Sequence, residues 1–137
     1  MKSPEHATLG ALASGLLVAA LPEVGFPVEA LALVAYGVLL SVFIDLDHFV
    51  VARYHAGDWS HFRRCATDPK FAFTEQERVF DGVDTRTLET HRLLSHALVG
   101  GALVGGLALV APVYGLFTAG VLYVHVVADL LRDGEIV

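Results

Sequence analysis

Four long apolar stretches run through this chain of 137 residues, and they constrain its fold more than any other feature. They cover residues 7–21, 28–51, 97–111 and 114–131, with few charges inside them. Apolar residues make up 55% of the chain, above the roughly 45–50% of an ordinary soluble domain. Long apolar runs are typical of membrane-crossing helices. The pattern therefore predicts a membrane protein with four helices.

Short turns separate the first stretch from the second and the third from the fourth. Residues 22–27 include two prolines and a glycine, which predicts a turn, and Pro112 to Gly115 predicts a second turn. Helices joined by short turns lie antiparallel. We therefore expect an all-α fold, a four-helix antiparallel membrane bundle formed by a single domain over residues 1–137. The spacing of Gly101 and Gly105 predicts close packing of the third helix against a neighbour.

The segment 52–90 between the second and third helices has a different composition. It contains six of the nine basic residues together with many acids and aromatics. Residues 74–77 match a capping box, which predicts a short helix over 75–80, and Asp81 with Gly82 predicts a turn after it. We expect this segment to be a soluble, partly helical cap or insertion.

Potential metal ligands gather where the apolar stretches begin or end. In an antiparallel order, the starts of the first and third helices and the ends of the second and fourth lie on one side. Ionised groups in an apolar setting are costly unless they are paired or bind metal, so this placement indicates a site. The residues concerned are His6, Asp45, Asp47, His48, His91, His96, His125 and Asp129.

Local spacing divides these residues by helix face. Residues three or four apart share a face, so Asp45 lies with His48 and His125 lies with Asp129. Asp47 points about 200° away from Asp45 on an ideal helix. It is therefore a candidate for a supporting carboxylate, a catalytic base or a ligand of a second ion.

The third helix carries His91, Arg92 and His96 near its beginning. The two histidines are five residues apart and cannot face one point from a straight helix, so we expect His91 at the helix start. Arg92 shares a face with His96 and could hold an anionic group such as phosphate or carboxylate.

Nitrogen and oxygen ligands suit a divalent ion, and zinc or manganese fits best, as one ion or two. Cys65 is the only cysteine, which excludes a site built on several thiolates. We interpret His55 and His61 as structural. A bound ion lowers the pKa of its water and generates a nucleophile, so hydrolysis is the chemistry that this ligand set favours.

The charges bear on partners and orientation. A net charge of −6 argues against nucleic acid as a partner. All basic residues lie on the side of the predicted site, and the two opposite turns contain none. The positive-inside rule therefore predicts a multi-pass protein of the cell membrane whose site faces the cytoplasm.

Taken together, the motifs resemble those of the membrane-bound, LexA-regulated, metal-dependent hydrolases of bacteria and archaea. The resemblance rests on His6 before an apolar helix, the D-x-D-H of residues 45–48, the H-R-x-x-S-H of residues 91–96 and the H-x-x-x-D of residues 125–129. It covers essentially the whole chain. The family's proline before the first aspartate is absent, since Ile44 precedes Asp45. The resemblance implies a hydrolase.

Three functions are compatible with these observations. The first is an integral membrane metal-dependent hydrolase, in which metal-activated water attacks a phosphoester or lipid-like substrate that enters from the cytoplasmic interface of the membrane. Asp47 would act as a supporting carboxylate or base, and Arg92 would bind an anionic group. The primary metal ligands would be Asp45, His48, His96 and Asp129, with His6, His91 and His125 as additional ligands. The second is a non-catalytic membrane protein that binds or transports a cation. The third is a structural membrane protein whose segment 52–90 docks a cytoplasmic partner.

Overall fold

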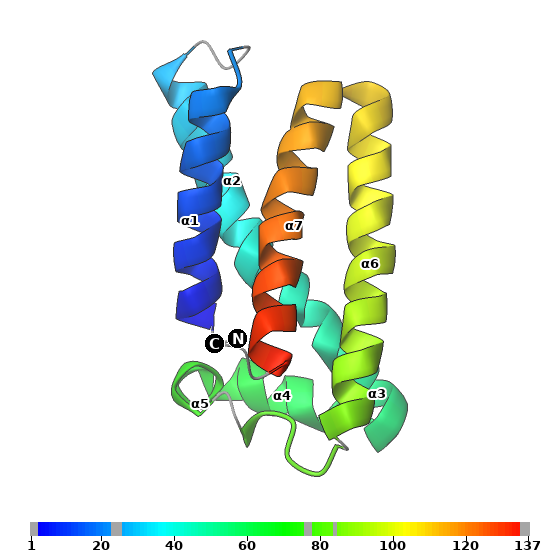
Figure 1. Cartoon of the computed structure of the whole chain (residues 1–137). Coiled ribbons are helices and arrows are strands. Elements are labelled where there is room, and N and C mark those ends of the chain that lie inside the picture. The colour runs from blue at the N-terminus through cyan, green and yellow to red at the C-terminus, as the bar shows by residue number, and fades with distance from the viewer. Residues whose placement is uncertain (1–2, 23–25, 76–77, 84, 135–137) are drawn as a thin grey trace. The chain divides into compact units, whose positions relative to one another are not determined.

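The computed structural model describes residues 3–22, 26–75, 78–83 and 85–134, without the side chains of residues 73 and 85–89. Over these residues the regular secondary structure consists of helices and contains no strand, which confirms the all-α class (Figure 1). The helices are α1 (Ser3–Ala20), α2 (Pro27–Phe43), the 3-10 turn η1 (Ile44–Leu46), α3 (Asp47–Ala56), α4 (Ser60–Thr67), α5 (Pro69–Thr74), α6 (Thr85–Val110) and α7 (Pro112–Asp133).

The chain divides into two compact units. The core unit combines Met1–Ile44 with Ala97–Val137, and the middle unit is Asp45–His96. The core unit holds α1, α2, the later part of α6 and α7. The middle unit holds α3, α4, α5 and the beginning of α6.

In the core unit, α1 packs against both α2 and α7. Its contact with α2 is a reciprocal match of glycine and serine. A Cβ added at Gly10 would lie 2.6 Å from Ser41 Oγ, and one added at Gly37 would lie 1.8 Å from Ser14 Oγ. Both helices therefore carry a Gly-x-x-x-Ser pattern that lets their backbones approach closely, as small residues do in membrane helices. This contact was not predicted from the sequence.

Apolar side chains complete the core unit. Leu33 of α2 packs with Phe117 and Val121 of α7, and these residues are almost fully buried. Closer to the start of both helices the Tyr114 hydroxyl donates a hydrogen bond to Glu29 Oε1 at 2.7 Å. Because both partners stand near the start of their helices, α2 and α7 run in the same direction.

The connection between α6 and α7 is shorter than predicted. Val110 ends α6 and Pro112 already begins α7, so Gly115 lies inside a helix rather than in a turn. A Cβ at Gly115 would lie 2.8 Å from the backbone of Ala108, so the two helices approach closely beside the turn that joins them. Proline suits the first turn of a helix, where its missing N–H has no partner to lose.

The predicted packing at Gly101 and Gly105 is wrong. Both residues are exposed, and a Cβ at either position would meet nothing within 4 Å. The glycine that α6 buries in the core unit is Gly100, where a Cβ would approach Leu122 at 3.1 Å. The spacing of two glycines cannot by itself show which side of a helix faces a neighbour.

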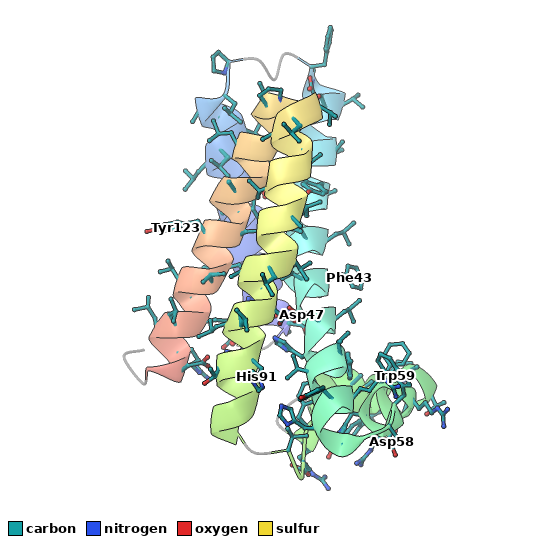
Figure 2. The ribbon with its side chains drawn as sticks, turned by 90° about the vertical axis from the view of Figure 1, so that its right-hand side faces the viewer. Phe43, Asp47, Asp58, Trp59, His91 and Tyr123 are labelled. Atoms are coloured by element: carbon teal, nitrogen blue, oxygen red, sulfur yellow. The ribbon has the colours of Figure 1, made fainter. Side chains whose placement is uncertain are left out.

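Three helical segments are long and apolar enough to cross a membrane, by length and composition. They are Pro27–Ala56, Thr90–Val110 and Pro112–Asp133. The shorter α1 is not among them. Large apolar side chains also lie on the outside, as Figure 2 shows for Phe43 and Tyr123, which are 56% and 71% exposed. An apolar exterior of this kind is expected of a protein surrounded by lipid.

The second apolar stretch does not form one uniform helix. It passes from α2 through the 3-10 turn of η1 into α3. A 3-10 turn is tighter than an α-helical turn, and within a longer helix it often marks a functional position. Here it contains Asp45 and directly precedes Asp47, so the change in winding coincides with the two carboxylates.

The middle unit contains two short helices that the sequence did not predict, α4 and α5. Asp68 caps α5 by accepting a hydrogen bond from the Phe71 N–H at 3.0 Å, and Pro69 occupies the first turn. The helix predicted over 75–80 is wrong where it is described, because α5 ends at Thr74 and residues 78–80 form only a 3-10 and turn segment. Residues 76–77 lie outside the described residues.

The middle unit contains packed aromatic side chains and one turn that was predicted from the sequence. Phe49 of α3 contacts the rings of Phe62 and Phe80, with centroids 5.5 and 5.3 Å apart. The predicted turn at Asp81 and Gly82 is confirmed, and Gly82 has a φ of +89° that favours glycine. Hydrogen bonds from Ser60 lower the pKa of the exposed Asp58, which stands before α4.

Candidate metal centre

Two groups of histidine and aspartate side chains are arranged as metal ligands, and each unit contains one. In the core unit the ligand atoms come from His6, His125 and Asp129. In the middle unit they come from Asp45, His48 and His96. Within each group the ligand atoms all lie within 4.8 Å of one another. We call these the core group and the middle group.

The core group places one carboxylate between two imidazoles. Asp129 Oδ1 lies 3.3 Å from His6 Nε2, and Asp129 Oδ2 lies 3.4 Å from His125 Nε2. The two rings stack with their centroids 4.1 Å apart. His6 stands in the first turn of α1, and the other two residues share one face near the end of α7, as their spacing predicted. All three side chains are at most 1% exposed.

One imidazole of the middle group, that of His96, lies between two carboxylates, Asp45 of the group and Asp47 beside it. His96 Nε2 lies 3.1 Å from Asp45 Oδ1, and His96 Nδ1 lies 2.8 Å from Asp47 Oδ2. A neutral imidazole has a single N–H, so it can donate to only one of the two carboxylates. If that N–H is on Nδ1, the lone pair of Nε2 faces Asp45 and can accept a proton or a cation.

His48 adds a second imidazole to the middle group. Its Nε2 lies 3.5 Å from Asp45 Oδ1, which confirms that these two residues share a helix face. Its ring stacks on that of His96 with centroids 5.1 Å apart. Within the described residues His48 Nε2 has no hydrogen-bond partner, although the side chain is almost completely buried. A buried nitrogen in this position fits a metal ligand.

Asp47 occupies the supporting position that the sequence left open. Its Oδ2 atom contacts His96 Nδ1 and also accepts a hydrogen bond from Ser95 Oγ at 2.7 Å. A carboxylate behind a metal-binding histidine fixes the ring orientation and tautomer. Asp47 and Asp45 point in different directions but contact the same residue. Asp47 Oδ2 contacts Nδ1 of the His96 ring, and Asp45 Oδ1 contacts Nε2 of that ring.

Ser95 was not given a role from the sequence. Its hydroxyl contacts Asp47 Oδ2 and also lies 2.9 Å from the Arg92 carbonyl oxygen in the preceding turn of α6. Its position directly before His96 in the H-R-x-x-S-H motif was the available signal. Because neighbouring residues of a helix point in different directions, that signal did not indicate a shared partner.

His91 and Arg92 lie in the first half of α6, and the structure corrects the predicted position of His91. The helix begins at Thr85, so His91 stands inside it and not at its start. Among the described residues His91 belongs to neither ligand group. Its Nδ1 lies 3.0 Å from His55 Nε2 on α3. Arg92 is half-buried and lies one turn before His96.

Two further side chains help to define the possible ligands. His61 Nδ1 donates a hydrogen bond to the Val79 carbonyl oxygen at 2.7 Å, which fits the structural interpretation of this histidine. Partial burial raises the pKa of the Cys65 thiol, so the ligand form, a thiolate, is disfavoured at neutral pH. The candidate ligands therefore remain imidazole nitrogen and carboxylate oxygen.

The donor atoms of both groups fit a divalent metal ion. Two imidazoles and one carboxylate are a common protein ligand set for zinc, iron and manganese, and three ligands leave a coordination position open for water or substrate.

Comparison with protein-family models, with curated proteins and with solved structures finds no match for this chain.

Proposed function

We propose that this chain is an integral membrane metal-dependent hydrolase. The observation that carries the proposal is the middle group, in which Asp45, His48 and His96 face one another and Asp47 supports His96 from behind. Such a set, with a supporting carboxylate and without thiolates, is the arrangement expected of a catalytic metal site rather than a closed structural one.

The proposed membrane arrangement is an antiparallel bundle of α1, α2, α6 and α7. It is supported by the three long apolar segments and by the directions of the helices in the core unit. Six of the nine basic residues of the sequence belong to segment 52–90, while residues 22–27 and 112–115, which join the helices at the other end of the predicted bundle, contain none. By the positive-inside rule, the ligand groups face the cytoplasm.

In the proposed reaction each residue of the middle group has a distinct part. Asp45, His48 and His96 would hold a zinc or manganese ion, which when bound supplies an activated water at neutral pH. Asp47 holds the Nδ1 proton of His96, so that Nε2 keeps its lone pair for the ion. Arg92 stands one turn before His96 and would bind the anionic part of a phosphoester or lipid-like substrate.

The core group would hold a second ion. His6, His125 and Asp129 provide two nitrogens and one carboxylate, the same donor types as the middle group. Ionisable residues within membrane helices are rare and usually functional, which supports a role beyond packing for this cluster. Removal of Asp129 should therefore lower the number of bound ions.

Metal analysis combined with a hydrolysis assay tests the proposal. Detergent-purified protein without an affinity tag should hold divalent metal and hydrolyse at least one member of a panel of phosphomonoesters and phosphodiesters. His96→Ala should abolish turnover while the helical content is retained. His61→Ala is the matched control, because this histidine of the same unit bonds a backbone carbonyl. Wild-type protein that binds no more metal than an Asp45→Ala, Asp129→Ala double variant would refute the proposal.

The burial of the core group favours a second candidate function, cation binding or transport without catalysis. The side chains of this group are at most 1% exposed, so a bound ion would have little room for a substrate. A carrier would bind metal but hydrolyse no member of the ester panel. Metal uptake into proteoliposomes that is lost in Asp129→Ala, together with no turnover, would favour this function.

A further inference from the structure

A second pair of histidines connects the same two helices as the middle group. His55 of α3 and His91 of α6 bring their Nε2 and Nδ1 atoms to 3.0 Å. Figure 2 shows His91 on the lower part of α6. His55 is exposed and His91 is half-buried, so the pair is accessible to solvent. The proposed hydrolase does not use this pair.

The two histidine pairs of the middle unit repeat one geometry. His48 stacks on His96 with centroids 5.1 Å apart and an angle of 17° between the rings, and His55 stacks on His91 with the same two values. On α3 the two histidines are seven residues apart, which is two turns or roughly 10 Å along the axis. The inner pair lies beside carboxylates, and the outer pair lies where water can reach it.

We propose that His55 and His91 form a second, solvent-accessible binding site for a divalent transition-metal ion. Imidazole nitrogen is a preferred ligand of Cu²⁺, Ni²⁺ and Zn²⁺. Two nitrogens that bind one ion at about 2.0–2.1 Å stand roughly 3.0–3.4 Å apart at common coordination angles, so the observed separation needs little adjustment. Water from the solvent would complete the coordination. This site does not depend on the proposed hydrolase.

Two neutral ligands define which ions this outer site prefers. Without a charged ligand from the pair itself, hard ions such as Mg²⁺ and Ca²⁺ gain little, because they require oxygen ligands. Among first-row ions the affinity should follow the usual order, with Cu²⁺ above Ni²⁺. The site should therefore bind Cu²⁺ in the presence of a large excess of Mg²⁺.

Titration of full-length, tag-free protein in detergent with Cu²⁺ tests this site, with electron paramagnetic resonance to count the bound nitrogens. A background of Asp45→Ala, His96→Ala, His125→Ala and Asp129→Ala removes ligands of both the middle group and the core group. In that background one Cu²⁺ should bind with a signal from two imidazole nitrogens. Adding His55→Ala should remove this equivalent, and adding His91→Gln should do the same.

The Cu²⁺ titration has a matched control variant and a result that would refute the proposed site. His61→Ala in the same background should keep the two-nitrogen signal, because His61 is bonded to the Val79 carbonyl and not to the pair. Circular dichroism should show unchanged helical content for every variant. If His55→Ala and His91→Gln bind as much Cu²⁺ as their parent, with the same nitrogen signal, the two imidazoles only hydrogen bond to each other and the proposal is wrong.

Discussion

The core group and the middle group are built from the same two types of side chain, histidine and aspartate, in opposite arrangements. In the core group one carboxylate, Asp129, lies between two imidazoles. His96 of the middle group lies between two carboxylates, those of Asp45 and of the supporting residue Asp47. With ionised carboxylates and neutral imidazoles, the first set carries one negative charge and the middle group with Asp47 carries two.

This difference changes what each group can do with a divalent ion. The greater negative charge of the middle group attracts a cation more strongly, and its partial exposure leaves access for water and substrate. Asp45 is 20% exposed, whereas Asp129 is 1% exposed. Under the proposed function, the middle group would carry out the chemistry and the core group would hold an ion away from solvent.

Removing one carboxylate from each group is the most severe test of this comparison. Asp45→Ala should lower hydrolytic activity by at least about 10³-fold, or roughly 4 kcal/mol, because the ion loses its only charged direct ligand in the middle group. Asp129→Ala should lower the metal content but reduce activity less. Steady-state kinetics and metal analysis of both variants measure the ranking, and equal activity losses would contradict it.

Substitution of Gly10 probes how the core group is positioned. Gly10 stands one turn after His6 on α1, and a Cβ there would lie 2.6 Å from Ser41 Oγ. Gly10→Val should separate α1 from α2 and destabilise the protein by about 1–3 kcal/mol, as overpacking does. Gly101→Val is the control, because that position is open. Thermal unfolding in detergent measures both, and equal shifts would show that the glycine–serine contact is unimportant.

The supporting carboxylate should affect the middle group alone. Asp47→Asn keeps the size of the side chain but removes the charge that orients His96, so metal affinity in this group should fall by about 10–100-fold. Asp58→Asn changes an exposed carboxylate of the same unit and should leave metal affinity unchanged. Competition with a metal chelator gives the affinities. Wild-type affinity in Asp47→Asn would show that Asp47 is not a supporting residue.

The smallest expected effect concerns Ser95, whose hydroxyl donates a hydrogen bond to Asp47 Oδ2. Ser95→Ala removes one hydrogen bond to a charged group, which is worth about 1.5–3 kcal/mol in a buried setting and less where water can replace it. We expect metal affinity to fall by about fivefold. Ser95→Thr keeps the hydroxyl and should restore the wild-type value. Failure of threonine to do so would indicate that packing at this position matters and the hydrogen bond does not.

Local spacing predicted much of each group. The sequence indicated that His125 and Asp129 share a face of one helix and that Asp45 and His48 share a face of another, because a helix places residues three and four apart side by side. The positions of apolar stretches likewise predicted the all-α class and the ends of the helices that hold ligands. These features are set by residues that are close to one another in the sequence.

Contacts between distant residues were decided by the tertiary structure. The sequence could not show that Asp47 would hold His96, that His91 would meet His55, or that the packed glycines would be Gly10 and Gly37 and not Gly101 and Gly105. Each of these depends on the rotation of one helix against another and, for the carboxylates, on the 3-10 turn of η1. The order of residues alone specifies neither the rotation nor the 3-10 turn. The rotation of a helix is set by the side chains of the neighbouring helices that it packs against.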